Sequence, residues 1–167
     1  MAGKVKALIG AVVLAAAFTG WAGWSWAQAS ADPDLAYATA REEALSAGRE
    51  QVAELSTLDY HDVEGGIARW LSVSTGALHD QLAATDTKAR QALAQAGTVS
   101  TGKVLDAAIG ELDEHAGTAK LLASVEITVA KAGVAPATRR NRFAAQVTRT
   151  GEGWKLSALD QVPVGSR

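Results

Sequence analysis

The pattern of hydrophobic and polar positions changes twice along the chain. Residues 7–27 form an uncharged apolar run. From about residue 33 to residue 97, apolar residues recur every three or four positions, which predicts helices. Beyond residue 97 apolar and polar residues alternate, which predicts strands. This order indicates an apolar segment followed by an α+β domain.

The apolar run at residues 7–27 is long enough to cross a bilayer. At about 1.5 Å per helical residue it reaches roughly 30 Å, the thickness of the hydrocarbon core. Lys4 and Lys6 precede it, so the positive-inside rule keeps residues 1–6 in the cytoplasm. We expect a single-pass protein of the cell membrane whose C-terminal domain is extracytoplasmic. Three tryptophans suited to the outer interface close the run: Trp21, Trp24 and Trp26.

A cleaved secretory signal is the alternative for the same segment. Ala27, Gln28 and Ala29 form an A-x-A cleavage motif. Both interpretations export the domain, and the question of cleavage after Ala29 stays open. The bulky tryptophans just before the motif favour the retained anchor, because small residues usually precede a cleavage site.

A long first helix follows the apolar segment. Asp32 and Pro33 are typical of a helix start, and the helix is predicted to end near Thr57. Its apolar face is thin, so we expect residues 28–57 to form a membrane-proximal stalk. Residues 58–167 are then expected to form the extracytoplasmic domain.

Two more helices are predicted before the strands. Asp59 is placed to cap the second helix, with Asp62 in its first turn, where a carboxylate complements the helix dipole. A third helix is predicted to continue to Gly97. The break between them falls at Ser74, Thr75 and Gly76.

Four strands are predicted in the second half. Their expected ranges are 99–112, 119–130, 139–150 and 154–159. Gly102, inside the first strand, indicates a bulge or bend. Residues 151–153 join the last two strands as a hairpin. We therefore predict about three helices packed on one face of a four-stranded antiparallel sheet.

The composition excludes several classes of function. The chain has no cysteine, which excludes disulfides, thiol catalysis and zinc–thiolate sites. The formal net charge is −2, and the exported part is more negative without Lys4 and Lys6. Binding of nucleic acid needs a basic face, so we expect no nucleic-acid partner.

The clustered acid and base groups are Asp59, His61 and Asp62. Such a set can serve general acid–base catalysis in a pocket. Helix capping already accounts for both carboxylates, so we expect no catalytic residue and no enzyme. His79 and His115 stand in no metal-ligand spacing, so no metal or other cofactor is expected either.

The basic cluster consists of Arg139, Arg140 and Arg142. Arginine side chains can hold a carboxylate, a phosphate or the acidic surface of a partner. The alternative is an edge strand protected by charge against unwanted pairing. Both interpretations remain open at this point.

The helical half carries a signature that resembles a known family. Residues 57–63 read TLDYHDV and residues 71–76 read LSVSTG. Together they resemble the "TLDY-x-D … LxxSTG" signature of actinobacterial membrane proteins associated with mammalian cell entry (Mce). His61 stands where a basic residue such as arginine is expected. The residues that match the signature, with structural roles, are Asp59, Tyr60, Asp62, Ser74, Thr75 and Gly76.

The resemblance implies a fold and a function. The fold is a cone-shaped domain of the nuclear-transport-factor type, related in shape to the periplasmic domain of a type IV secretion scaffold protein. The function is that of a non-catalytic accessory subunit that stabilises an Mce-type lipid import complex, with Mce subunits or other membrane proteins as partners.

A second function remains as the alternative. The cone can serve as an apolar pocket for a small ligand, in a carrier or in an isomerase- or dehydratase-like enzyme. A deep cavity that holds an Asp or a His favours that alternative, whereas a cone filled by apolar side chains favours the accessory subunit.

Overall fold

The structure is a computed structural model that describes residues 33–163. The predicted membrane segment at residues 7–27, with its tryptophans, lies outside the described residues, and so does the cleavage motif that ends at Ala29. None of the described helices is long and apolar enough to cross a membrane. The chain divides into two compact units, Met1–Thr39 and Ala40–Arg167.

The first described helix, α2 (Pro33–Leu55), begins in the first unit and ends in the second. Residues 34–39 of this helix, in the first unit, are exposed, Leu35 by 56%. In the second unit it buries a narrow apolar face that includes Ala44 and Val52. The predicted end of this helix is confirmed to within two residues, and its predicted cap, Asp32, lies outside the described residues.

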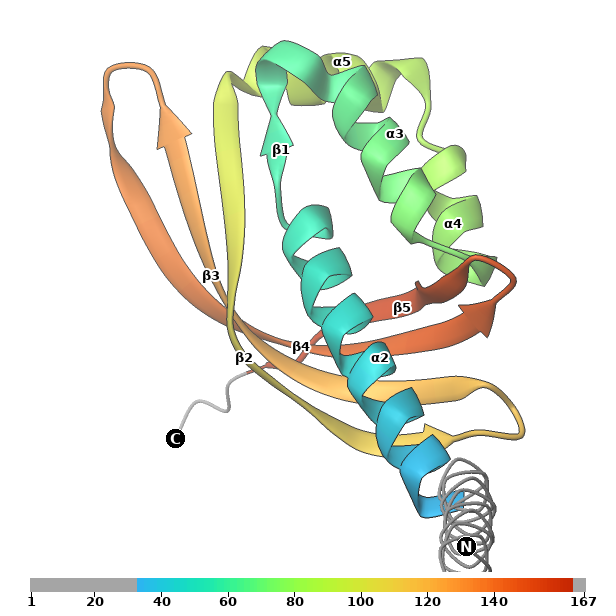
Figure 1. Ribbon diagram of the computed structural model, residues 1–167. Coiled ribbons are helices and arrows are strands. Elements are labelled where there is room, and N and C mark those ends of the chain that lie inside the picture. The colour runs from blue at the N-terminus through green and yellow to red at the C-terminus, as the bar shows by residue number, and fades with distance from the viewer. Residues whose placement is uncertain (1–32, 164–167) are drawn as a thin grey trace, which may run out of the picture. The chain divides into compact units, whose positions relative to one another are not determined.

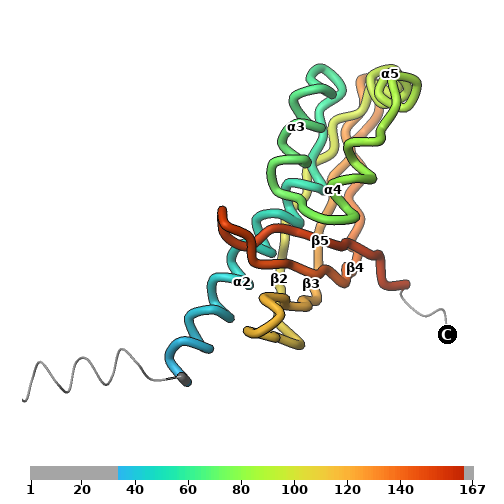
Figure 2. Tube along the Cα trace, turned by 90° about the vertical axis from the view of Figure 1, so that its right-hand side faces the viewer, coloured from blue at the N-terminus to red at the C-terminus, as the bar shows by residue number. Residues whose placement is uncertain are grey.

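Shorter helical segments follow in the second unit. Figure 2 shows them gathered at one end of this unit. The prediction of one helix as far as Gly97 was wrong, because the chain breaks at Asp86, whose carboxylate accepts a hydrogen bond of 2.7 Å from Ala89 N–H. The segments are η1 (Tyr60–Asp62), α3 (Val63–Val73), α4 (Gly76–Ala83) and α5 (Thr87–Ala96).

The described strands form one antiparallel sheet in sequence order (Figure 1). The α+β class is therefore confirmed, but the sheet has five strands where the sequence predicted four. The additional strand pairs Leu58 with Ser100 at the edge of the sheet. The strands are β1 (Leu58–Asp59), β2 (Thr98–Asp113), β3 (Thr118–Lys131), β4 (Val134–Thr150) and β5 (Gly153–Gln161).

The hydrophobic core of the second unit lies between α2 and one face of the sheet. Alternate residues of β3 face this core, as the period-2 pattern predicted. Trp154 of β5 is also buried, and its backbone oxygen accepts a hydrogen bond from Gln51 Nε2 of α2. The largest fully buried side chains are Leu121, Leu156, Val52, Val125 and Val147.

The structural role of Gly102 differs from the predicted one. It pairs regularly with Ile127, and the irregularities of β2 lie further on, between Val104 and Asp106 and between Ile109 and Glu111. The sequence predicted a bulge or bend at Gly102, and the strand pairing has no bulge at this residue. The missing side chain instead lets β2 approach the C-terminal end of α2 closely.

Candidate functional site

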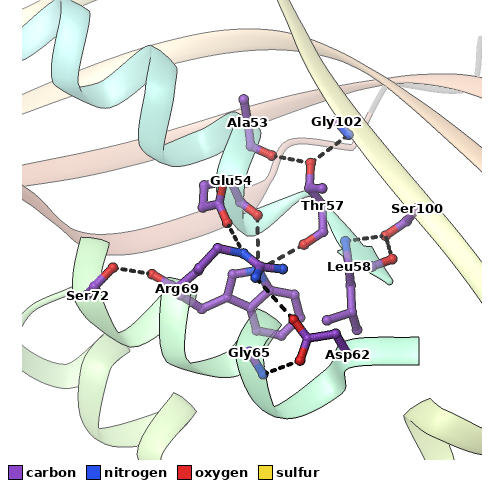
Figure 3. A network of polar contacts seen from close by, with 11 residues as sticks. Ala53, Glu54, Thr57, Leu58, Asp62, Gly65, Arg69, Ser72, Ser100 and Gly102 are labelled. Carbon is purple, nitrogen blue, oxygen red and sulfur yellow. Dashed lines mark hydrogen bonds and ion pairs between the residues drawn. The ribbon is translucent and has the colours of Figure 1, made fainter. Parts of the chain in front are cut away.

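The first half of the signature forms a corner between α2, β1, η1 and α3 (Figure 3). Trp70 Nε1 donates to two backbone oxygens, Glu54 O at 3.0 Å and Thr57 O at 3.1 Å. Backbone oxygens in the last turn of a helix lack intrahelical partners. The Trp70 side chain, half-buried on α3, therefore closes the C-terminal end of α2.

Thr57 and Ser100 attach this corner to the sheet. Thr57 Oγ1 donates to Ala53 O at 2.9 Å and accepts from Gly102 N–H at 3.0 Å. Ser100 Oγ accepts from Leu58 N–H at 3.1 Å. Two hydroxyl groups thus join the end of α2 and strand β1 to strand β2.

Asp59 and His61 form an exposed local turn. Asp59 Oδ1 accepts from His61 N–H at 2.9 Å and lies 2.7 Å from His61 Nδ1. The backbone N–H of His61, and after it the imidazole, hold the pKa of the Asp59 carboxyl below its ordinary value. Asp59 therefore stabilises a turn at the protein surface.

Asp62 caps α3 and also takes part in an ion-pair bridge. Its Oδ1 accepts from Gly65 N–H at 3.0 Å, as an N-cap does. Arg69 reaches back from α3 and joins Asp62 Oδ2, at 3.4 Å, to Glu54 Oε1 of α2, at 2.9 Å. This bridge cannot be predicted from the sequence, because no local rule pairs residues 54 and 69.

We predict that removing the Asp62 cap destabilises the fold modestly. Asp62→Ala is expected to lower the free energy of unfolding by about 1 kcal/mol, because Gly65 N–H loses its acceptor. Asp62→Asn retains an acceptor and serves as the control, since asparagine is also a good N-cap. Urea unfolding followed by circular dichroism measures both. Equal stability of the two variants would show that the cap contributes nothing.

The second half of the signature forms the corner between α3 and α4. Ser74 ends α3, and its backbone N–H donates to Leu71 O at 3.3 Å. Thr75 N–H donates to Leu156 O of β5 at 2.8 Å, and Gly76 has a φ of 57°, which favours glycine. This half of the signature therefore fixes the helices to the last strand.

A hollow lies beside His61 and Asp62. It has a volume of about 430 Å³, opens to solvent and is lined by residues of η1, α3 and α5. Arg90 of α5 crosses it to pair with Glu64 at 2.5 Å. Both His61 and Asp62 are exposed, so neither is a desolvated acid or base.

The three arginines lie on the half of β4 that extends beyond β5. Strand β5 ends at Gln161, opposite Phe143, so among the described strands only β3 pairs with β4 before that point. Arg139, Arg140 and Arg142 are all exposed. Arg140 Nε lies 3.3 Å from Glu126 Oε2 of β3. Within the described part of the chain, the other two arginines have no carboxylate within ion-pair distance.

Hollows accompany this half of β4 on both faces. The hollow on the core face has a volume of about 370 Å³. The hollow on the other face has a volume of about 420 Å³. The first is lined by Ile127, Val129, Ala137, Arg139 and Asn141, and the second includes Asp106, Ala108, Leu122, Ser124, Arg142 and Val162.

The chain matches a described protein family over nearly its whole length. Residues 4–163 match the model of the family "Uncharacterized protein Rv1363c/MT1408-like". The protein Rv1363c of Mycobacterium tuberculosis is 28% identical over 161 residues, which cover 94% of this chain and 59% of the relative. The chain thus spans little more than half the length of this relative.

Solved structures share the fold. An IcmL-like type IV secretion system protein from Legionella pneumophila has a TM-score of 0.61 at 10% identity, over 76% of this chain and 95% of its own. The periplasmic domain of DotI has a TM-score of 0.59 at 13% identity, over 72% and 93%. CagV of Helicobacter pylori, a VirB8 homologue, has a TM-score of 0.54 at 8% identity, over 72% and 96%. At these identities the likeness is one of fold.

Proposed function

Because the chain belongs to the Rv1363c/MT1408-like family, we propose that it is a non-catalytic accessory subunit of a membrane protein complex. Residues 7–27 anchor it in the cell membrane, and the domain that follows contacts other subunits outside the cytoplasm. The fold supports this proposal, since it is shared with the periplasmic domain of DotI and with other proteins of type IV secretion systems.

The finer proposal is that the complex is an Mce-type lipid importer. It rests on the TLDY and STG signature, which resembles that of Mce-associated membrane proteins. The mycobacterial relative supports an actinobacterial setting for this function. The signature residues hold the corners of the fold, so they keep the domain in shape for a partner that binds elsewhere.

The polar contacts of the signature favour an accessory subunit over an isomerase or dehydratase. Asp59 and Asp62 hold backbone N–H groups, and both are accessible to solvent. Between α2 and the sheet, the cone is filled by apolar side chains such as Leu121 and Leu156. General acid–base catalysis requires a group that reaches a bound substrate, and here the candidate groups lie at the outer surface.

The observation that carries the proposed partner contact is the exposed arginine cluster on the open half of β4. Arg139, Arg140 and Arg142 concentrate positive charge on a chain of formal net charge −2. Such a patch steers an acidic partner surface and raises the association rate. We propose these three arginines as the contact.

We predict that reversing the charge of the arginine cluster weakens the complex. The double variant Arg140→Glu/Arg142→Glu, as a tagged full chain in native membranes, is expected to recover about tenfold less of its partner subunits at low salt. Quantitative mass spectrometry of the purified complexes measures the recovery. The parent chain should lose partners as salt rises, because screening weakens the contact.

The matched control is Lys88→Glu/Lys120→Glu. It changes the net charge by the same amount and, like the arginine pair, includes one residue in an ion pair, Lys120 with Glu111 at 2.8 Å. This control is expected to leave recovery unchanged. Equal recovery of partner subunits with both double variants would show that the arginines do not take part in the contact. Recovery of membrane proteins other than Mce subunits would contradict the finer proposal alone.

A further inference from the structure

The open half of β4 leaves one side of its backbone without a strand. The β4–β5 ladder continues past Gln161 by one hydrogen bond, from Val162 N–H to Arg142 O at 2.8 Å. Pro163 follows and has no N–H to donate. Within the described residues, no strand pairs with this side of β4 before Arg142. A length of sheet edge is therefore exposed.

The register identifies which backbone groups face outward at this edge. Alternate residues of a strand direct their N–H and C=O groups to opposite sides. Arg142 directs its C=O toward Val162, and the pairing of β4 with β3 has no irregularity between residues 137 and 148. The N–H and C=O groups of Arg140 and Thr138 therefore face the open side. Pro136 comes next and limits the ladder, because it lacks a donor.

The charges at this edge of β4 determine which kind of strand can pair with it. Residues 134–142 contain three arginines and no acid. A second copy of the chain paired antiparallel about Arg140 would bring Arg140 opposite Arg140, and like charges directly opposite destabilise a sheet. An extended segment with acidic side chains has the complementary charge. The arginines that hinder self-pairing therefore favour a strand of opposite charge.

The two faces of the sheet beside this edge differ, so a strand added there needs a different kind of side chain on each face. On the core face the hollow beside the edge is lined by three apolar residues, Ile127, Val129 and Ala137, together with Arg139 and Asn141. On the opposite face lie Arg140 and, in the second hollow, Arg142. Because successive side chains of a strand point to opposite faces, an added strand fits both with alternating apolar and acidic residues.

We propose that the edge of β4 at residues 138–142 binds an extended acidic segment of a partner protein, which adds to the sheet as a further strand. Backbone hydrogen bonds to Thr138 and Arg140 hold the segment. Its acidic side chains contact Arg140 and Arg142, and its apolar side chains cover the hollow on the core face. This mode of binding rests on the proposed accessory function and specifies how the partner is held.

The test uses a peptide probe, acetyl-Thr-Glu-Val-Glu-Val-Glu-Thr-amide, with the full chain in detergent micelles. Amide hydrogen exchange measured by NMR is expected to slow about tenfold at Thr138 and Arg140 when the peptide saturates the site, because these N–H groups gain acceptors. Exchange at Arg139, whose N–H faces β3, is expected to stay unchanged. Binding of the peptide without protection at Thr138 and Arg140 would overturn the proposal.

Two matched comparisons separate strand addition from charge attraction. A peptide of the same sequence, N-methylated at the amides that face β4, keeps its charge but is expected to bind at least about tenfold more weakly. Arg140→Pro and Arg140→Ala both remove the charge, but only proline also removes the outward donor, so Arg140→Pro is expected to bind the unmodified peptide more weakly than Arg140→Ala. Equal binding of the two peptides to the parent chain would overturn strand addition.

The outcomes also separate this inference from the proposed function. Absence of peptide binding, together with partner recovery in native membranes that depends on the arginines, would leave the accessory function standing and overturn strand addition. Suppose instead that the peptide binds with the expected amide protection, but that recovery of partner subunits does not depend on the arginines. This outcome would support the strand site and contradict the proposed contact with the complex.

Discussion

Gly102→Ala is expected to destabilise the protein by about 3 kcal/mol or more, because overpacking against backbone cannot be relieved by a change of rotamer. A Cβ atom at residue 102 would lie 2.3 Å from Ser56 Cβ and 2.9 Å from Ala53 O. These atoms belong to the end of α2, which Trp70 and Thr57 hold in place. Relief of the clash would move β2 away from the corner and weaken the hydrogen bond from Gly102 N–H to Thr57 Oγ1.

Gly110→Ala provides the control on the same strand. The nearest atom to a Cβ at residue 110 is Lys120 O, at 4.0 Å, an ordinary contact. This variant is expected to match the parent chain or to be slightly more stable, because alanine restricts the unfolded chain. Urea unfolding followed by circular dichroism compares the two. If both variants unfold at the same urea concentration, the close approach of β2 to α2 at Gly102 does not affect the free energy of unfolding.

The long strands could be predicted from the sequence because their pattern is local. Strand β3 alternates buried and exposed side chains from Ala119 to Val125, so its core face can be read directly from the order of residues. The turn at residues 151–153 needs glycine for its backbone, and Gly153 has a φ of 105°. Features of this kind need no knowledge of what lies across the fold.

The short strand β1 could not be predicted in this way. It has two residues, and the Ser100 hydroxyl that accepts from Leu58 N–H lies 42 positions away along the chain. The same limit applies to Gly102, whose role depends on the distance to Ser56. The break before α5 was a different kind of error. Asp86 is a good capping residue, but the apolar spacing continues across the break and hides it.

The arginine-bearing half of β4 could be predicted only in part from the sequence. From the sequence alone, the arginines have two interpretations, edge protection and partner binding. The structure shows that β4 lies between two strands for part of its length and forms an edge for the rest, because β5 is the shorter strand. That difference in length exposes the outward groups of Thr138 and Arg140. No pattern within residues 134–142 encodes it.

Gly48→Ala and Leu121→Ala are expected to destabilise the protein separately but to compensate each other when combined. A Cβ at residue 48 of α2 would lie 2.7 Å from Leu121 Cδ2. Gly48→Ala alone should cost about 1–3 kcal/mol through this overlap. Leu121→Ala alone should cost about 2–5 kcal/mol, because it empties a site in which Leu121 is only 2% exposed.

In the double variant the alanine at residue 48 occupies part of the space that Leu121 leaves, so the overlap that destabilises Gly48→Ala alone is absent. The combined loss should therefore be smaller than the sum of the single losses by about 1 kcal/mol or more. Urea unfolding of the four proteins gives this coupling. Leu156→Ala, combined with Gly48→Ala, is the control, since Leu156 is fully buried but is absent from the atoms nearest to a Cβ at residue 48. A coupling no larger for Leu121 than for Leu156 would show that α2 does not approach β3 at Gly48 as closely as described.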